Sequence, residues 1–391
     1  MKPIRISPKV YWVGAIDWDI RDFHGYKTPR GTSYNAYLIV DDEVVLVDTV
    51  KRHLMDDMMA RIAEVVEPAR ISKIVVNHVE MDHAGSLADV SRLVPEAQIL
   101  VSGRGKLGLS RYHDLPREPD TVESGAEIHT GSLTLKFVHT PMVHWPDSMV
   151  TYIPEENLLL SNDAFGQHVA SDARFDDQLG WGLLAEEAGT YYANIVMPYG
   201  DQVNKAMSAL NGLDIETIAP SHGVIWRAYI DRIVEQYGKW ANHETDNRAL
   251  IVYDTMWGST HMIAKSLAEG LENASIPVTV RSLKTSHISE VMADLLMSKV
   301  VLIGSPTLNN GMLPTVSAFT TYLKGLRPKN RIGIAFGSHG WGGQGAREVD
   351  AVIRALDWNV PREPVATQYK PDHNELSEAL AVGKMLADLL K

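Results

Sequence analysis

The sequence predicts an α/β protein of two domains, the second of which is a doubly wound, five-stranded parallel sheet. Its 391 residues exceed the size of one ordinary domain. Strand and helix patterns alternate regularly after residue 248, whereas the patterns before it are mixed. A run of polar residues at 242–248 separates the two regions. We therefore place the domains at residues 1–247 and 248–391.

The two domains differ in how their elements are spaced. In the first, strand-like apolar runs lie at 10–13, 35–40, 43–48 and 133–139, and a helical pattern covers 51–66. In the second, strand patterns lie at about 249–253, 277–282, 299–303, 331–336 and 364–368, separated by helical segments near 260–272, 286–296, 314–324, 344–356 and 374–390. Such alternation gives a parallel sheet with right-handed crossovers, and five strands fit a flavodoxin-like fold.

The composition excludes several classes of protein. A formal net charge of −12 and the lack of a basic stripe argue against nucleic-acid binding. No apolar run reaches the roughly 18 residues of a membrane span, and the N-terminus leads into a strand pattern without a signal-peptide core. The chain has no cysteine, so it offers no disulfide, iron–sulfur or thiolate-bound metal site. We expect a cytoplasmic protein with no nucleic-acid or membrane partner.

Four metal-competent side chains, His78, Glu80, Asp82 and His83, lie within six residues at the end of an apolar strand pattern. No packing argument calls for four polar groups at the end of a buried strand. In an extended backbone, alternate residues point to one side, so His78, Glu80 and Asp82 are expected to converge, with His83 turned toward a neighbouring position. Two imidazoles and two carboxylates exceed what one ion needs, which indicates a two-metal site.

The remaining ligands of such a site must come from later in the chain. His144, Asp163 and His222 each occupy a loop-like position after an apolar strand pattern. Asp163 is the natural bridge, because one carboxylate can span two ions. Isolated histidines are more often surface or core residues than metal ligands. The cluster of four polar side chains at 78–83, however, favours a metal-binding role over a structural one.

Glu80 bears on the identity of the metal. The first domain resembles the metallo-β-lactamase fold, an αββα sandwich whose hydrolases carry a histidine at this position and typically hold zinc. A carboxylate is a harder and more negatively charged ligand than the imidazole it replaces. Sets of histidine and carboxylate ligands without thiolate suit non-haem iron or manganese. The ligand types alone leave iron, manganese and zinc open.

The second domain carries a candidate anion site where its first strand meets a helix. Hydroxyls, a glycine and a helix N-terminus form a cradle there, without the lysine of a nucleotide triphosphatase loop. A monophosphate therefore fits better than a triphosphate. The residues expected to contact it are Thr255, Met256, Trp257, Gly258, Ser259 and Thr260.

Two further loops follow the third and fourth strands of the same domain. Ligands of open α/β sheets bind at this edge, where glycines admit a ring and tryptophans can stack on it. The three loops together indicate FMN. The later loops contribute Pro306, Thr307, Leu308, Asn309, Asn310 and Gly311, and Ser338, His339, Gly340, Trp341, Gly342 and Gly343.

With both halves in view, the chain resembles the flavodiiron proteins of the class without a fused rubredoxin. These join a metallo-β-lactamase-like domain with a non-haem diiron centre to a flavodoxin-like domain with FMN. The pattern H-x-E-x-D-H, followed by three later ligands, carries the resemblance. It implies that His78, Glu80 and His144 bind one iron, that Asp82, His83 and His222 bind the other, and that Asp163 bridges them.

The resemblance also implies an activity and partners. Members reduce dioxygen to water, nitric oxide to nitrous oxide, or both, and reduced FMN with a diferrous pair holds the four electrons that dioxygen needs. A rubredoxin-like module needs four cysteines, so the electron donor is expected to be a separate rubredoxin-like protein, a reduced deazaflavin or a similar carrier. A head-to-tail homodimer, or a dimer of such dimers, is expected.

Residues next to the metal ligands are expected to set the preference between the two gases, which the sequence leaves open. We single out His24 and Tyr192 as candidate catalytic residues, with His168 and Tyr191 as further candidates. Two other functions compete with gas reduction. One is a zinc-dependent hydrolase with an appended flavodoxin domain, and the other is a pure FMN electron carrier.

Overall fold

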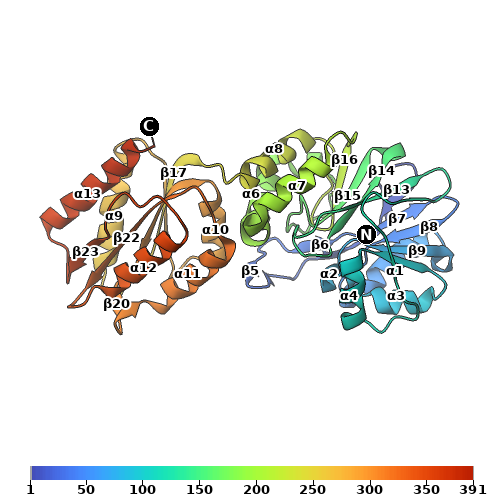
Figure 1. Cartoon of the computed structure of the whole chain (residues 1–391), viewed down its shortest axis with the longest axis horizontal. Coiled ribbons are helices and arrows are strands. Elements are labelled where there is room, and N and C mark those ends of the chain that lie inside the picture. Colours follow the sequence, from blue (N-terminus) through green and yellow to red (C-terminus); the bar gives the residue numbers. More distant parts are fainter. Residues whose placement is uncertain (1, 391) are drawn as a thin grey trace. The chain divides into compact units, whose positions relative to one another are not determined.

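The computed structural model describes residues 2–390, which form two compact units (Figure 1). The first unit comprises the residues up to His24 together with Thr28–Tyr191 and Tyr199–Gly238. The second comprises Gly25–Lys27, Tyr192–Pro198 and the chain from Lys239 onward. The main segment of the second unit thus begins inside helix α8 (Ile230–Ala241), ahead of the polar residues at 242–248.

Two β-sheets form the centre of the first unit. The larger has the strand order β1-β2-β7-β8-β9-β10-β11, and the smaller has the order β12-β13-β14-β15-β16. The strands of the larger sheet are Ile4–Arg5, Val10–Trp12, Tyr37–Val40, Val44–Val47, Ile71–Val76, Gln98–Val101 and Asp120–Thr121. Those of the smaller sheet are Glu127–His129, Thr134–His139, Met149–Ile153, Leu158–Asn162 and Thr217–Pro220.

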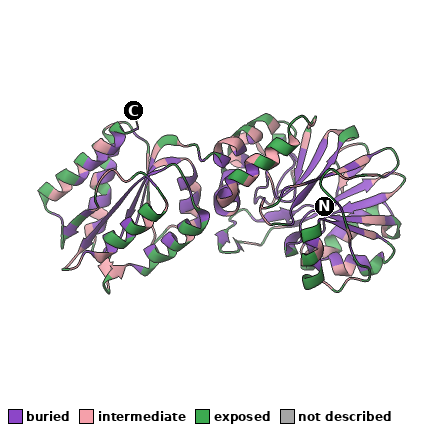
Figure 2. Cartoon of the chain, viewed as in Figure 1, coloured by how far each residue is buried: buried purple, intermediate pink, exposed green. Residues whose placement is uncertain are grey.

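The apolar strand β8 is buried on both faces, which explains its unbroken Val-Val-Leu-Val sequence. Val45 and Val47 pack in one core with Phe137 of β13, between the two sheets. Leu46 points the other way, into a second core that it shares with Ile62 of helix α1. Figure 2 shows the strands mostly buried and the outer faces of the helices exposed. Sheets between helices form an αββα sandwich.

The helices and short strands of the first part of the chain have the following bounds. The α-helices are α1 Met55–Val65, α2 Met81–Ala84, α3 Leu87–Leu93, α4 Gly103–Tyr112, α5 Asp176–Leu179, α6 Trp181–Tyr191 and α7 Gly200–Leu210. The 3-10 helices are Arg52–Leu54, Pro68–Arg70, Pro154–Glu156 and Met197–Tyr199, and a π-helix spans Tyr192–Val196. The short strands are β3 Ala15–Asp17, β4 Asp22–Phe23, β5 Tyr26–Lys27 and β6 Thr32–Tyr34.

The second unit contains a five-stranded parallel sheet with the order β18-β17-β19-β22-β23. This is the flavodoxin-like order, and it confirms the predicted doubly wound fold. The strands, in chain order, are β17 Asp246–Tyr253, β18 Val278–Ser282, β19 Ser298–Gly304, β22 Ile332–His339 and β23 Val365–Gln368, with a hairpin of β20 Thr307–Leu308 and β21 Gly311–Met312. The helices are α9 Ser259–Glu272, α10 Ile288–Leu296, α11 Pro314–Leu326, α12 Gln344–Ala355 and α13 His373–Asp388.

Helices α9 and α13 pack against each other along one face of this sheet (Figure 1). They approach closely at Gly270 and Gly383, where a Cβ on either glycine would lie 2.9 Å from the Cα of the other. A larger residue at either position would push the helices apart. Among the described residues, no helix is both long and apolar enough to cross a membrane.

Candidate metal centre and flavin pocket

The ligand-rich segment after β9 is extended only as far as Glu80. Glu80 then caps the short helix α2, and its carbonyl oxygen accepts from the backbone N–H of His83 (3.0 Å) and of Ala84 (2.8 Å). This corrects the expectation that His78, Glu80 and Asp82 converge in an extended chain. The helical turn instead directs Asp82 and His83 together to a second group of ligands.

The structure gathers the seven predicted metal ligands into two groups. The first group is His78, Glu80, His144 and Asp163, and the second is Asp82, His83 and His222. Within each group, the ligand atoms all lie within 4.8 Å of one another. In the first group, Glu80 Oε2 lies 3.3 Å from the Nε2 atoms of both His78 and His144.

Asp163 stands between the two groups and turns one carboxylate oxygen toward each. Its Oδ2 lies 3.7 Å from His78 Nε2 and 3.5 Å from His144 Nε2. Its Oδ1 lies 3.1 Å from His83 Nε2 and 3.3 Å from His222 Nε2. Ligands that share one ion at bonds of about 2.0–2.2 Å are separated by distances of this order. The arrangement suits one carboxylate bridging two ions.

Several buried ligand atoms make no hydrogen bond, only close approaches to one another, which fits the binding of metal ions. Both carboxylate oxygens of Asp82 and Asp163, and both ring nitrogens of His83, are buried without a hydrogen-bond partner among the described residues. Leaving such atoms unpaired costs free energy, so buried charged groups are normally paired or bound to metal. Two metal ions would bind most of these atoms at once.

Hydrogen bonds on the far side of two histidines fix their metal-facing nitrogens. His222 Nδ1 donates to the carbonyl oxygen of Ser33 (2.9 Å), so in the neutral imidazole the Nε2 carries the lone pair that a metal would bind. Asp147 Oδ2 lies 2.9 Å from His78 Nδ1 and also accepts from the backbone N–H of Val79. Such partners orient metal-binding histidines and raise their basicity. The sequence reasoning missed Asp147, although it is a carboxylate three residues after the predicted ligand His144.

Mutual pairing holds the ligands in charged forms when no metal is bound. Burial raises the pKa of Asp163, but the nearby His83 and His222 lower it by more than burial raises it. The pKa of Asp163 therefore lies well below its usual range. Burial lowers the pKa of His222, but its close contacts with the carboxylates of Asp163 and Asp82 outweigh burial and raise the pKa to about 10. Metal ions must therefore displace protons from the histidines.

Of the candidate catalytic residues, His24 lies at the ligand cluster. Its Nε2 is 3.0 Å from Glu80 Oε1, the carboxylate oxygen that does not face His78 and His144. The imidazole of His24 is largely exposed. It therefore occupies a position from which it can orient Glu80 while remaining in contact with solvent.

The two neighbouring tyrosines lie in different surroundings. The ring centroid of Tyr191 is 5.9 Å from that of His222, whereas Tyr192 belongs to the second unit and packs against Trp240 at 5.3 Å. The structure therefore favours Tyr191, not Tyr192, as a neighbour of the metal ligands. His168 is also close, with its ring centroid 4.9 Å from that of His222 and its Nδ1 2.7 Å from Thr32 Oγ1.

The ammonium group of Lys51 lies against two aromatic rings that neighbour the ligand His222. Its ammonium lies 4.9 Å from the ring centroids of both Phe23 and Tyr34. Those rings are in turn 6.1 Å and 5.8 Å from the ring of His222. No sequence motif predicts this placement, because Lys51 is far along the chain from Phe23 and Tyr34, the two residues that it contacts.

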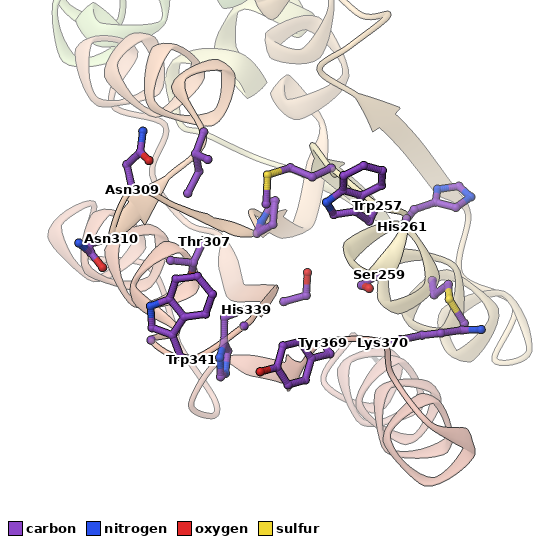
Figure 3. Close-up of a pocket in the computed structure, with 18 residues that line it drawn as sticks. Trp257, Ser259, His261, Thr307, Asn309, Asn310, His339, Trp341, Tyr369 and Lys370 are labelled. Atoms are coloured by element: carbon purple, nitrogen blue, oxygen red, sulfur yellow. The ribbon is translucent and has the colours of Figure 1, made fainter.

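The loops at the carboxyl edge of the parallel sheet enclose a pocket of about 1160 Å³ (Figure 3). This volume lies slightly above the usual range for small-molecule sites, about 300–1,000 Å³. The predicted residues that line it are Met256, Trp257, Gly258, Ser259, Pro306, Thr307, Leu308, Asn309, Asn310, Ser338, His339, Gly340, Trp341 and Gly342.

Four predicted residues are not among those that line this pocket, namely Thr255, Thr260, Gly311 and Gly343. Thr255 Oγ1 accepts from Gly258 N (3.1 Å), which shapes the first loop. Thr260 is fully buried and its hydroxyl lies 3.0 Å from that of Ser338. Gly343 caps helix α12 with a φ of 69°, a conformation that favours glycine.

Four lining residues were not predicted, namely His261, Met262, Tyr369 and Lys370. Tyr369 and Lys370 follow the fifth strand, so the rule that ligands bind at strand carboxyl ends could have found them. Lys370 adds a positive charge to a site expected to hold a phosphate.

The pocket suits a flavin mononucleotide. No side chain caps the N-terminus of α9, which leaves first-turn N–H groups available to an anion. The side chains of Trp257 and Trp341 are 94% and 88% exposed, and they stand on different sides of the pocket (Figure 3). Exposed aromatic faces of this size can stack on a planar ring.

Comparison with known proteins matches each of the two domains to a protein family. Residues 32–223 match the ODP family beta-lactamases, and residues 251–383 match the flavodoxin family. A nitric oxide reductase of Moorella thermoacetica is 43% identical over 392 residues, which cover 99% of this chain and 98% of that protein.

Two solved structures are similar over the full length of the chain. The rubredoxin oxygen:oxidoreductase of Desulfovibrio gigas is 37% identical, with a TM-score of 0.97, and the match covers 100% of this chain and 98% of that one. The flavodiiron protein of Giardia intestinalis is 31% identical, with a TM-score of 0.96, and the match covers 100% and 97%. With this similarity over both domains, the chain belongs to the flavodiiron protein family.

Proposed function

We propose that this oxidoreductase reduces dioxygen to water, nitric oxide to nitrous oxide, or both, at a diiron centre that receives electrons through FMN. The position of Asp163 between two ligand groups carries the proposal, because it supports a pair of ions rather than one. The similar nitric oxide reductase and rubredoxin oxygen:oxidoreductase support the choice of gases.

In this proposal, His78, Glu80 and His144 would hold one iron, and Asp82, His83 and His222 would hold the other. Asp163, with one oxygen toward each group, would be shared between them. Two of the three residues on each iron are histidines, and the carboxylates balance part of the positive charge. When bound, the iron pair and FMN together supply the four electrons that reduction of dioxygen to water requires.

Two side chains around the ligands have proposed supporting roles: one orients a ligand and contacts solvent, and the other contributes a positive charge. His24 holds the outer oxygen of Glu80 and, being exposed, can exchange protons with water. Lys51 contributes a positive charge near the second ligand group, which favours the negative charge that reduction adds to the gas. Both gas reductions consume protons, so groups of this kind are needed at the centre.

The electron donor and the assembly also belong to the proposal. With no cysteine among its 391 residues, the chain offers no rubredoxin-type iron site, and we assign the supply of electrons to a separate rubredoxin-like protein, a reduced deazaflavin or a similar carrier. A head-to-tail homodimer would place the FMN of each chain beside the diiron centre of its partner. Two equivalent short electron paths would result.

Metal analysis and gas consumption test the proposal together. The purified protein should hold two iron ions and one FMN per chain, and when reduced without air it should consume nitric oxide, dioxygen or both. Parallel rates with the two gases would then give the preference. Zinc in place of iron, with no gas consumption, would instead support a hydrolase, and FMN without metal would support an electron carrier.

A further inference from the structure

The first unit contains a small apolar cavity between the five-stranded sheet and helix α7. Its volume is about 20 Å³. Strands β14 and β15 contribute Val150 and Leu159 to its wall, and α7 contributes Val203, Ala206 and Met207. A cavity needs about 10–15 Å³ to hold one water-sized guest, so this one has room for a single small molecule.

The surface that faces the cavity is apolar, although Thr140, Ser161 and Tyr237 contribute to the wall. The hydroxyl of Ser161 donates to the carbonyl oxygen of Ala164 (2.8 Å). The hydroxyl of Tyr237 accepts from the backbone N–H of Phe165 (2.7 Å). A buried water normally needs two to four hydrogen-bond partners, whereas apolar cavities stay dry and bind guests such as xenon. An apolar guest is therefore favoured.

The inner wall of the cavity belongs to the segments that carry two metal ligands. Val143, which lines it, immediately precedes His144. Ala164 and Phe165, which also line it, immediately follow Asp163. At the α7 side, Ala206 and Met207 are half-buried, so this side of the cavity lies near the surface of the unit.

We propose that this cavity binds the diatomic gas substrate on its way to the metal centre. The inference rests on the proposed function, and it assigns that function a binding site. Dioxygen and nitric oxide are small and weakly polar, so an apolar wall attracts them while it excludes water. Met207 is a flexible side chain at the half-buried side, where it can move aside for a guest.

Xenon tests the site without reference to activity. Crystals of the whole protein under xenon pressure should show a xenon atom between Val203 and Val143. The Ala206→Leu variant, whose added atoms enter the cavity, should lose this xenon. Ala209→Leu is the matched control, because Ala209 lies on the same helix, is exposed and does not line the cavity. Val203→Leu provides a second way to fill the space should Ala206→Leu fail to fold.

The rate of gas binding tests the role. In stopped-flow mixing of the reduced protein with nitric oxide, the absorption change of the metal site should be several-fold slower in Ala206→Leu or Val203→Leu than in the parent or in Ala209→Leu. Iron and FMN contents should stay unchanged. Absence of xenon in the parent protein would overturn the proposal, as would loss of xenon with an unchanged binding rate. A parent that binds xenon and nitric oxide but completes no turnover would contradict the proposed function while supporting the gas site.

Discussion

His24 Nε2 lies 3.0 Å from Oε1 of Glu80, while the other oxygen of this carboxylate faces His78 and His144. A proposed metal ligand is thus held in place by a residue that is not itself among the seven proposed ligands. Hydrogen bonds of this kind set the orientation of a ligand and the charge that it presents to a metal. Because the partner is a largely exposed histidine, the contact also joins the site to solvent.

Replacing His24 should therefore slow the reaction without emptying the site. In His24→Phe, we expect turnover of the preferred gas to fall roughly 10–100-fold, as is typical when the partner of a metal ligand is lost. Iron content should stay near that of the parent. His53→Phe is a suitable control, because His53 is exposed and its Nε2 lies 3.8 Å from Asp17, a weak contact. Unchanged turnover in His24→Phe would remove His24 from the mechanism.

Changing Glu80 should alter the metal. We expect Glu80→His to take up zinc in place of iron and to lose reductase activity, because imidazole replaces a hard anionic ligand. The substitution also removes the acceptor of His24. Metal analysis of protein grown with both metals gives the ratio, and Glu80→Asp, which keeps the carboxylate, should retain more iron. Full iron content and normal turnover in Glu80→His would contradict this account of the site.

Metal uptake should release protons at neutral and mildly alkaline pH. The raised pKa of His222, about 10, means that the metal-free site is protonated there. Because this pKa exceeds the unfolded value of 6.5, the imidazolium stabilises the metal-free fold below that pH and loses this effect as the pH rises through about 10. Calorimetric titration of metal into the metal-free protein at pH 8, in buffers of different ionisation enthalpy, counts the protons. His222→Gln should release fewer protons, and an equal number would show that the proton lies elsewhere.

The sequence predicts some elements of the fold and of the metal site, but not others. The apolar run at 43–48 predicted a strand, which the structure shows at Val44–Val47, and the regular alternation after residue 248 predicted the parallel sheet. The four-residue helix Met81–Ala84 is too short for a periodic pattern, so periodicity could not predict the turn that directs Asp82 and His83 away from His78 and Glu80, although the family resemblance implied the two ligand groups. The contact of Asp147 with His78 spans 69 residues and is set by the fold alone.

FMN binding should survive loss of the first unit. The pocket lies entirely in the second unit, which has its own core. A fragment that starts near Lys239 should fold and bind one FMN, seen as a yellow protein after dialysis. A fragment that starts at Asn247 should be less stable, because Arg331 Nη1 loses the carbonyl oxygen of His243, 3.2 Å away. A folded fragment from Lys239 that stays colourless in excess FMN would contradict the assigned pocket.

The last prediction concerns the proposed head-to-tail dimer, and it uses two variants that are each inactive. His78→Ala removes a proposed iron ligand and leaves the FMN pocket intact. Ser259→Asp places a negative charge at the first turn of α9, against the expected phosphate. Ser259 is a better choice than Thr260, because Thr260 is fully buried and a carboxylate there would disturb folding.

When the two variants are mixed and exchange subunits, half of the dimers contain one chain of each kind. If electrons pass between chains, each mixed dimer holds one intact FMN–iron pair out of two, so about a quarter of the parent activity should return. Differently tagged chains and native mass spectrometry give the fraction of mixed dimers, and each variant alone is the control. Mixed dimers that form and remain inactive would show that electrons do not pass from the FMN of one chain to the iron of the other.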